Sequence, residues 1–188
     1  MVNVGILAIQ GGYQAHIDKL NQLGAKTTKI TSSKELSSIN ALVIPGGESS
    51  VFLKLLDSSF KSKLLELNIP TLSTCAGTIL LAKKVLNPTQ DSLGLLDIEV
   101  KRNAYGRQLE SFKTNEIIWK ETSQAADFEA IFIRAPKIIK TGKEVKILLT
   151  HNGDAVLIKQ DKHLAATFHP ELCKDNSSIH KMFLSMLS

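Results

Sequence analysis

Cys75 is the residue whose surroundings most clearly predict chemistry, because it lies between small residues in Ser73-Thr74-Cys75-Ala76-Gly77. Residues 70–73 predict a strand, and residues 76–84 predict a helix. A nucleophile at a sharp strand-to-helix junction is the arrangement called a nucleophile elbow. The positive end of the helix also stabilises a thiolate. By itself the pattern fits equally well a buried cysteine that packs as a small apolar side chain.

A thiol nucleophile needs a base, and the base needs a group that orients it. His169 and Glu171 follow an apolar run that predicts a strand. Side chains two residues apart in an extended segment point to the same side, so Glu171 can bond the imidazole nitrogen that does not face Cys75. The alternative is a surface histidine beside a solvated glutamate. The other four histidines lack a preceding apolar strand combined with a carboxylate two residues later.

An acyl-transfer site also requires N–H donors for the oxyanion. The segment Pro45-Gly46-Gly47-Glu48-Ser49-Ser50 follows a predicted strand, and its glycines let backbone N–H groups face a ligand without a Cβ in the way. We therefore predict an oxyanion hole formed by the N–H groups of Gly47 and Ala76. The alternative is a glycine turn with Ser49 as a helix N-cap, a role that is compatible with the functional one.

Short apolar runs alternate with segments of helical period in the first half of the chain, the pattern that builds a parallel sheet covered by helices. After Asn87-Pro88 the pattern changes to short β-rich pieces, which predict an antiparallel extension or layer. We expect one α/β domain over residues 1–188, with a doubly wound sheet and a β-rich second half. The predicted strands are 4–9, 41–44, 70–73, 98–100, 130–133, 145–149, 155–158 and 164–168, and helical periodicity marks 17–23, 51–56, 76–84 and 176–187.

The composition is that of an ordinary globular protein, with 43% apolar and 22% charged residues among 188. Two cysteines make no disulfide framework. His169, Cys173 and His151 are residue types that can bind a metal, but their spacing supports a metal site only weakly, so we expect no metal. The net charge of +5 permits a nucleic-acid partner, but scattered lysines and 5% aromatic residues favour a solvated surface. Without a long apolar run or a leader pattern, we expect a cytoplasmic protein with no membrane contact.

Six motifs extend the pattern along nearly the whole chain: Leu7-Ala8-Ile9-Gln10-Gly11, Pro45-Gly46-Gly47-Glu48-Ser49, Thr74-Cys75-Ala76-Gly77, Arg102-Asn103-Ala104-Tyr105-Gly106-Arg107-Gln108, Phe132-Ile133-Arg134-Ala135-Pro136 and Phe168-His169-Pro170-Glu171. Together they resemble the class I, triad-type glutamine amidotransferases, and most closely the glutaminase subunits of pyridoxal 5′-phosphate synthases. The cysteine and His-x-Glu elements are typical of the broad class. Gly-Arg-Gln and Ile-Arg-Ala-Pro narrow the resemblance to this kind of subunit.

The resemblance implies a flavodoxin-like, mixed but mostly parallel sheet flanked by helices, together with glutaminase activity. It implies that Cys75 attacks the side-chain amide of glutamine, that His169 moves the proton and that Glu171 holds the imidazole, giving a γ-glutamyl thioester that water hydrolyses. The arginines of the implied pocket fit physically, because the α-carboxylate of glutamine calls for a fixed cation. For Arg107 a surface salt bridge is the alternative. The implied pocket residues are Gly47, Glu48, Ser49, Arg107, Ile133 and Arg134.

The resemblance further implies that ammonia passes to a separate (β/α)₈ synthase subunit in a hetero-oligomer, which builds pyridoxal 5′-phosphate (vitamin B6), and that this chain needs no cofactor. A docked partner makes chemical sense, since free ammonia becomes ammonium at neutral pH and loses its nucleophilic lone pair.

Three features depart from the family pattern without touching the triad. Ser73 stands where glycine is common, Ser50 replaces a usual threonine, and residues 12–16 replace a commoner small-and-charged run.

Three other functions stay open. The glutaminase subunit of another amidotransferase, such as imidazole glycerol phosphate synthase, shares the nucleophile and the His-x-Glu element but not the Arg107 and Arg134 motifs. A thiol-bearing regulatory or binding module on the same fold would follow if Cys75 were inert. Nucleic-acid binding would require a coherent basic face.

Overall fold

A large mixed sheet forms the centre of the computed structural model, which describes residues 2–102, 104, 111–174 and 176–187. Neighbouring strands are parallel from β2 to β13 and antiparallel from β13 to β8. The predicted mixed sheet and its antiparallel extension are thus confirmed. In spatial order the strands are β2 (Lys26–Ile30), β1 (Asn3–Leu7), β3 (Ala41–Ile44), β4 (Thr71–Thr74), β13 (His163–Ala166), β12 (Asp154–Gln160), β11 (Lys146–His151) and β8 (Ile118–Trp119).

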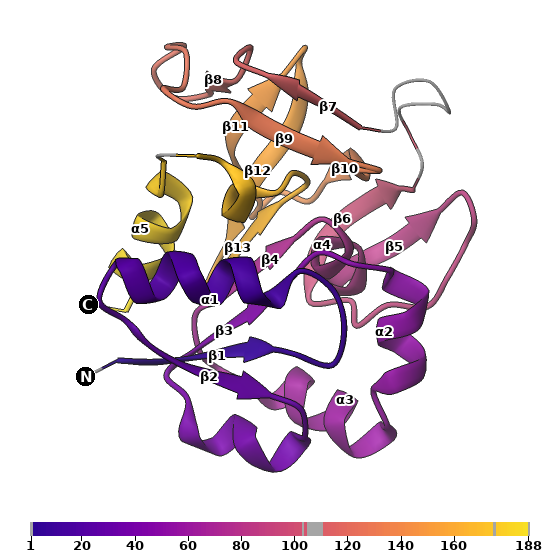
Figure 1. The fold of residues 1–188 in the computed structure, drawn as a ribbon. Helices are drawn as coiled ribbons and strands as arrows, with labels where there is room; N and C mark the ends of the chain where they lie inside the picture. Colours follow the sequence, from indigo (N-terminus) through magenta and orange to yellow (C-terminus); the bar gives the residue numbers. More distant parts are fainter. Residues whose placement is uncertain (1, 103, 105–110, 175, 188) are drawn as a thin grey trace.

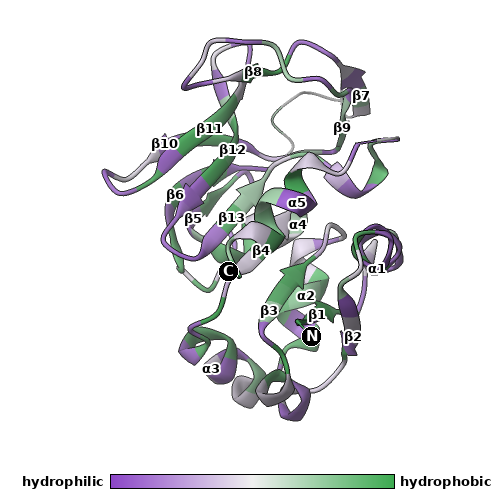
Figure 2. Cartoon of the chain, turned by 90° about the vertical axis from the view of Figure 1, so that its left-hand side faces the viewer, coloured by the Kyte–Doolittle hydropathy of each residue, from purple (hydrophilic) through white to green (hydrophobic). Residues whose placement is uncertain are grey.

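Both faces of the parallel part are covered by helices. In β3, Leu42 and Ile44 belong to one apolar core, and Ala41 and Val43 belong to the other. The strand is therefore apolar along its whole length, as Figure 2 shows. Helices α1 (Tyr13–Gln22) and α5 (Ser178–Ser185) contribute to one core, and α2 (Ser49–Leu55), α3 (Ser58–Glu66) and α4 (Ala76–Leu81) to the other. This arrangement is the predicted doubly wound fold.

Two smaller sheets supply the rest of the β-rich second half. One contains, in order, β10 (Lys137–Thr141), β6 (Leu96–Lys101) and β5 (Ala82–Leu86), and the other pairs β7 (Ser111–Thr114) with β9 (Ala130–Ile133). Two short 3₁₀ helices, η1 (Ser33–Ser38) and η2 (Pro170–Leu172), complete the described elements. The strands β8, β9 and β11 occupy the upper part of Figure 1, above the parallel strands β1, β2 and β3.

One predicted helix is wrong in extent. Residues 76–84 were expected to be helical, but α4 ends at Leu81, and Ala82–Leu86 form β5, which pairs in parallel with β6. Alanine and lysine favour helix locally, so the pairing with a distant strand overrides the local preference. Helix α3 and strands β2, β7, β8 and β10 were not among the predicted elements. Among the described residues, no helix combines the length and apolar character needed to cross a membrane.

The topology brings the predicted site residues to one edge of the sheet. The parallel strands β1, β3, β4 and β13 all end at the same edge, and the chain leaves each of them through a loop there. Those four loops carry, in chain order, residues 10–12, 46–47, Cys75 and His169.

Candidate active site

Cys75 occupies a strained turn between β4 and α4. Its backbone has φ 45° and ψ −107°, a region that residues with a Cβ rarely adopt. Gly77 lies against β3, and a Cβ there would overlap the carbonyl group of Ile44. The predicted elbow is therefore present, and a glycine in the first turn of α4 allows that helix to approach the neighbouring strand.

Ser73, one of the three departures from the family pattern, is accommodated beneath the elbow. Its side chain is buried, and its Oγ lies 3.2 Å from the Oγ1 of Thr78. The Thr78 hydroxyl donates to the carbonyl of Ala166 at 2.7 Å, so the Ser73 hydroxyl acts as the donor to Thr78. The extra hydroxyl thus has a partner and ties β4 to the following helix.

His169 and Glu171 form a buried hydrogen-bonded pair. The His169 Nδ1 lies 2.7 Å from the Glu171 Oε1, and the Glu171 side chain is 1% exposed. The predicted pairing is present, but the reason given for it was wrong. Residues 170–172 form the 3₁₀ helix η2 rather than an extended segment, so the turn itself brings the two side chains together.

The electrostatics of this pair favour a charged carboxylate and a protonated ring. Burial opposes ionisation of Glu171, but the imidazole groups of His16 and His169 outweigh that penalty and lower its pKa to about 2. Burial likewise opposes protonation of His169, but the neighbouring Cys75 and the hydrogen-bonded Glu171 raise the pKa of His169 to about 10. His169 therefore remains an imidazolium at neutral pH, in the form that can donate a proton.

We expect this shift to be visible in a histidine titration followed by NMR. Because the pKa of His169 is raised, its ring should stay protonated through neutral pH and lose its proton only as the pH rises toward about 10. Glu171→Gln removes the negative partner and should move the His169 titration toward the ordinary histidine range. A wild-type ring that titrates near 6.5, or one that does not respond to Glu171→Gln, would contradict the pairing.

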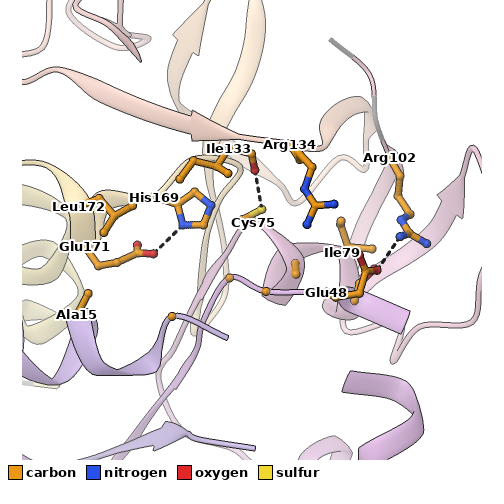
Figure 3. Close-up of a pocket in the computed structure, with 15 residues that line it drawn as sticks. Ala15, Glu48, Cys75, Ile79, Arg102, Ile133, Arg134, His169, Glu171 and Leu172 are labelled. Atoms are coloured by element: carbon orange, nitrogen blue, oxygen red, sulfur yellow. Dashed lines mark hydrogen bonds and ion pairs between the residues drawn. The ribbon is translucent and has the colours of Figure 1, made fainter. Parts of the chain in front are cut away.

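The thiol of Cys75 faces both the histidine and β9. Its Sγ lies 3.7 Å from the carbonyl oxygen of Ile133, and the His169 ring lies beside it in Figure 3. Gly46 packs against both groups, since a Cβ there would lie 2.5 Å from the His169 Cε1 and 3.4 Å from the Cys75 Cβ. The end of β3 thus packs against both the Cys75 side chain and the His169 ring.

The two residues predicted to supply the oxyanion donors, Gly47 and Ala76, line the same cavity as Cys75. Ala76 is the first residue of α4, where a backbone N–H has no acceptor within its own helix. The carbonyl of Gly46 accepts from the N–H of Gly12 at 3.0 Å. A planar trans peptide directs the Gly47 N–H opposite to that carbonyl, away from the loop that precedes α1. That these two N–H groups bind an oxyanion stays a prediction.

Gln10 holds the same loop at a second point. Its side-chain amide donates to the carbonyl of Glu48 at 3.2 Å, and its Oε1 accepts from the Glu48 N–H at 3.3 Å. With the Gly12 contact, the loop after β1 fixes the backbone on both sides of Gly47.

A cavity of about 290 Å³ opens beside the thiol. It contains the predicted site residues that the structure describes, and Figure 3 shows the Arg134 and Glu48 side chains on its wall. Arg107 lies outside the described residues. The lining residues are Gly12, Ala15, Gly46, Gly47, Glu48, Ser49, Cys75, Ala76, Ile79, Arg102, Ile133, Arg134, His169, Glu171 and Leu172.

Arg102 is the main pocket residue for which no role was predicted. Its guanidinium donates to the Glu48 Oε1 at 2.8 Å and also contacts Gln90. Burial opposes ionisation of Glu48, but hydrogen bonds from Ser50 and the positive charge of Arg102 lower its pKa overall. Arg102 belongs to one of the quoted motifs, but no sequence pattern shows that it pairs with a residue 54 positions away.

The start of α2 also differs from the suggested cap. Glu48, not Ser49, is the N-cap residue, and its carboxylate accepts from the Ser50 N–H at 3.4 Å. The Ser49 side chain is buried and donates to the Oε1 of Gln90 at 3.0 Å. The Ser50 hydroxyl also donates to the Glu48 Oε1, at 3.1 Å. Serine therefore supplies a hydroxyl to the N-cap carboxylate at the position where a threonine is usual.

Comparisons with known proteins agree with this geometry. The model of the SNO glutamine amidotransferase family matches residues 6–188. A pyridoxal 5′-phosphate synthase subunit PdxT from Thermotoga neapolitana is 44% identical over 99% of this chain and 100% of its own. A protein of the same name from Thermoanaerobacter sp. is 46% identical over the full length of both chains.

Solved structures agree as well. A crystal structure described as a glutamine amidotransferase superimposes with a TM-score of 0.88, at 36% identity and 98% coverage of each chain. The match spans both the parallel half and the β-rich half, so the fold expected from the resemblance is confirmed. On its sequence and its architecture, this chain belongs to the SNO glutamine amidotransferase family.

Proposed function

We propose that Cys75, His169 and Glu171 are the catalytic residues of this glutaminase, which supplies ammonia to pyridoxal 5′-phosphate synthesis. His169 holds the proton of the Cys75 thiol, so the Sγ attacks the side-chain amide carbon of glutamine as a thiolate, and the oxyanion is held by the N–H groups of Gly47 and Ala76. As the carbon–nitrogen bond breaks, the His169 imidazolium gives its proton to the leaving amine, which departs as ammonia. Water, deprotonated by His169, then attacks the thioester and releases glutamate.

The observation that carries this proposal is the contiguous set of contacts from Glu171 to the thiol. Glu171 bonds the His169 Nδ1 at 2.7 Å, and the His169 ring lies beside the Cys75 thiol at the strained elbow. A structural cysteine needs none of these features, because burial alone explains its packing. A nucleophile needs all of them.

The charges on the cavity wall suit the two charged groups on the α-carbon of free glutamine. Arg134 lines the cavity and offers a cation for the α-carboxylate. Its backbone has a positive φ of 44°, a conformation that the surrounding loop must stabilise. Glu48, ionised beside Arg102, offers an anion for the α-ammonium group. Arg107 is proposed as a further contact to the carboxylate on the family pattern alone.

Mixing this chain with a pyridoxal 5′-phosphate synthase subunit tests the function directly. Glutamine should support pyridoxal phosphate formation in the mixture, and Cys75→Ala should abolish that support while free ammonium salts still sustain synthesis. If glutamine supports no synthesis while ammonium does, the proposed delivery of ammonia is wrong.

We further propose that the (β/α)₈ synthase subunit docks on this chain and activates it by ordering the Gly46-Gly47 loop. The support is that this loop is held by Gln10 and Gly12, residues of the segment that precedes α1. A partner could bind this segment more tightly when the Gly47 N–H faces the oxyanion. Such a partner would shift the loop toward the conformation that is active. One missing oxyanion donor costs roughly 10²–10³ in rate.

Ammonia release by the chain alone should therefore rise by roughly 10²–10³ when the synthase subunit is added. Gln10→Ala removes both contacts to Glu48 and should reduce this rise, while leaving alkylation of Cys75 intact. Gln124→Ala, at an exposed glutamine outside the cavity, is the matched control and should behave as wild type. Equal turnover with and without partner at saturating glutamine would show that the loop needs no activation.

A further inference from the structure

Two buried histidines that the mechanism does not use lie behind Glu171. His16 comes from α1 and His180 from α5, and both are 0% exposed. The His16 Nε2 lies 3.3 Å from the Glu171 Oε2, and its Nδ1 lies 3.0 Å from the His180 Nε2. The Thr74 Oγ1 also lies 3.2 Å from the His16 Nε2. A continuous polar chain therefore runs from His169 through Glu171 and His16 to His180.

Both histidines are neutral in this environment. Burial lowers the pKa of His16, and the positive charge of His169 lowers it further. The negative charge of Glu171 raises it, but not enough to reverse the shift. Burial, His16 and Lys19 together lower the pKa of His180 to about 3, against the attraction of Glu171. Each ring therefore carries one proton, and its place can be deduced from the contacts.

The contacts select one tautomer for each ring. Among the described residues, the buried His180 Nδ1 has no hydrogen-bond partner. A buried N–H without an acceptor is rarer than a buried acceptor without a donor, so the proton of His180 lies on Nε2 and is donated to the His16 Nδ1. The proton of His16 must then lie on its Nε2, which faces Glu171. The opposite tautomer would set a lone pair of His16 against a carboxylate oxygen.

We propose that His16 is a positioning residue for the catalytic pair, and that His180 holds His16 in the tautomer whose Nε2–H faces Glu171. The proposal rests on the proposed role of Glu171. In the described part of the chain, the Glu171 Oε2 has no hydrogen bond of good geometry. The His16 Nε2, 3.3 Å away, is the polar group that faces this oxygen. Held from this side, the carboxylate presents Oε1 to the His169 Nδ1.

A pair of amide substitutions separates this role from simple packing. The amide nitrogen of glutamine can occupy the place of the histidine Nε2, whereas that of asparagine reaches only the place of Nδ1. In the presence of the synthase subunit, His16→Asn should lower kcat for glutamine hydrolysis roughly tenfold, because it removes a polar contact with a charged group, with KM unchanged. His16→Gln should stay within about threefold of wild type, because it keeps a donor facing Glu171.

A double-mutant cycle shows whether His16 acts through Glu171. In a Glu171→Gln background the charged oxygen is gone, so adding His16→Asn should cost less than about twofold. Full additivity, or equal kcat for His16→Asn and His16→Gln, would overturn the proposal. If Glu171→Gln alone keeps wild-type turnover, the proposed triad fails instead, and the two failures are thus distinct.

The tautomers provide a test that needs no variant to fold. Nitrogen NMR of the wild-type protein should show His16 and His180 both neutral and protonated on Nε2 at neutral pH. An Nδ1 proton on His16 would contradict the proposal, because the ring could not donate to Glu171.

Discussion

Replacing Cys75 with alanine should abolish glutamine hydrolysis, with a loss in kcat of more than about 10⁴-fold. No other described side chain at the elbow is a nucleophile that could form the thioester. The fold should survive, because alanine fits the same turn and the side chain is nearly buried. Ammonia release with the synthase subunit present measures the loss, and circular dichroism checks the fold.

Cys173→Ala is the matched control, because the chain offers a second buried cysteine close to the site. The Cys173 thiol donates to the carbonyl of His169 at 3.6 Å, and burial raises its pKa to about 11. Such a thiol is a poor nucleophile at neutral pH. Its replacement should change kcat by less than about threefold, since it removes only one weak hydrogen bond. A loss as large as that of Cys75→Ala would call the choice of nucleophile into question.

His169→Ala should have the second largest effect, a loss in kcat of about 10⁴-fold or more. Alanine can neither hold the thiol proton nor donate to the leaving amine. Glu171→Gln should lose less, because the amide oxygen can still accept from the His169 Nδ1, although it no longer carries the charge that stabilises the imidazolium. Steady-state ammonia release by the purified variants gives both values.

The order of these two losses is itself informative. If His169→Ala keeps wild-type turnover, the histidine is not the base. If Glu171→Gln costs more than His169→Ala, the carboxylate does more than orient the ring.

The placement of Cys75, His169 and Glu171 in the fold was predictable because its evidence is local in the sequence. The elbow around Cys75 and the His169-x-Glu171 spacing each occupy a few consecutive residues, and parallel strands bring their ends to one edge of the sheet. The apolar run of β3 was predictable with its correct bounds for the same reason, since every residue in 41–44 is buried.

The missed features depend on contacts between distant residues. Strand β5 exists because it pairs with β6, although its own residues favour helix. The ion pair of Arg102 with Glu48 and the contact of His16 with Glu171 join separate elements, so no spacing rule reports them. The extent of the glutaminase domain, residues 1–188, and the role of Arg107 stay predictions.

The most direct test of the central claim is covalent labelling of the nucleophile. The protein, with its synthase partner, is treated with an alkylating analogue of glutamine, digested and mapped by mass spectrometry, with and without an excess of glutamine. The account predicts a label on the peptide that contains Cys75, suppressed by glutamine and greatly slowed in His169→Ala. A label mainly on Cys173, or a label on Cys75 that glutamine does not suppress, would contradict it.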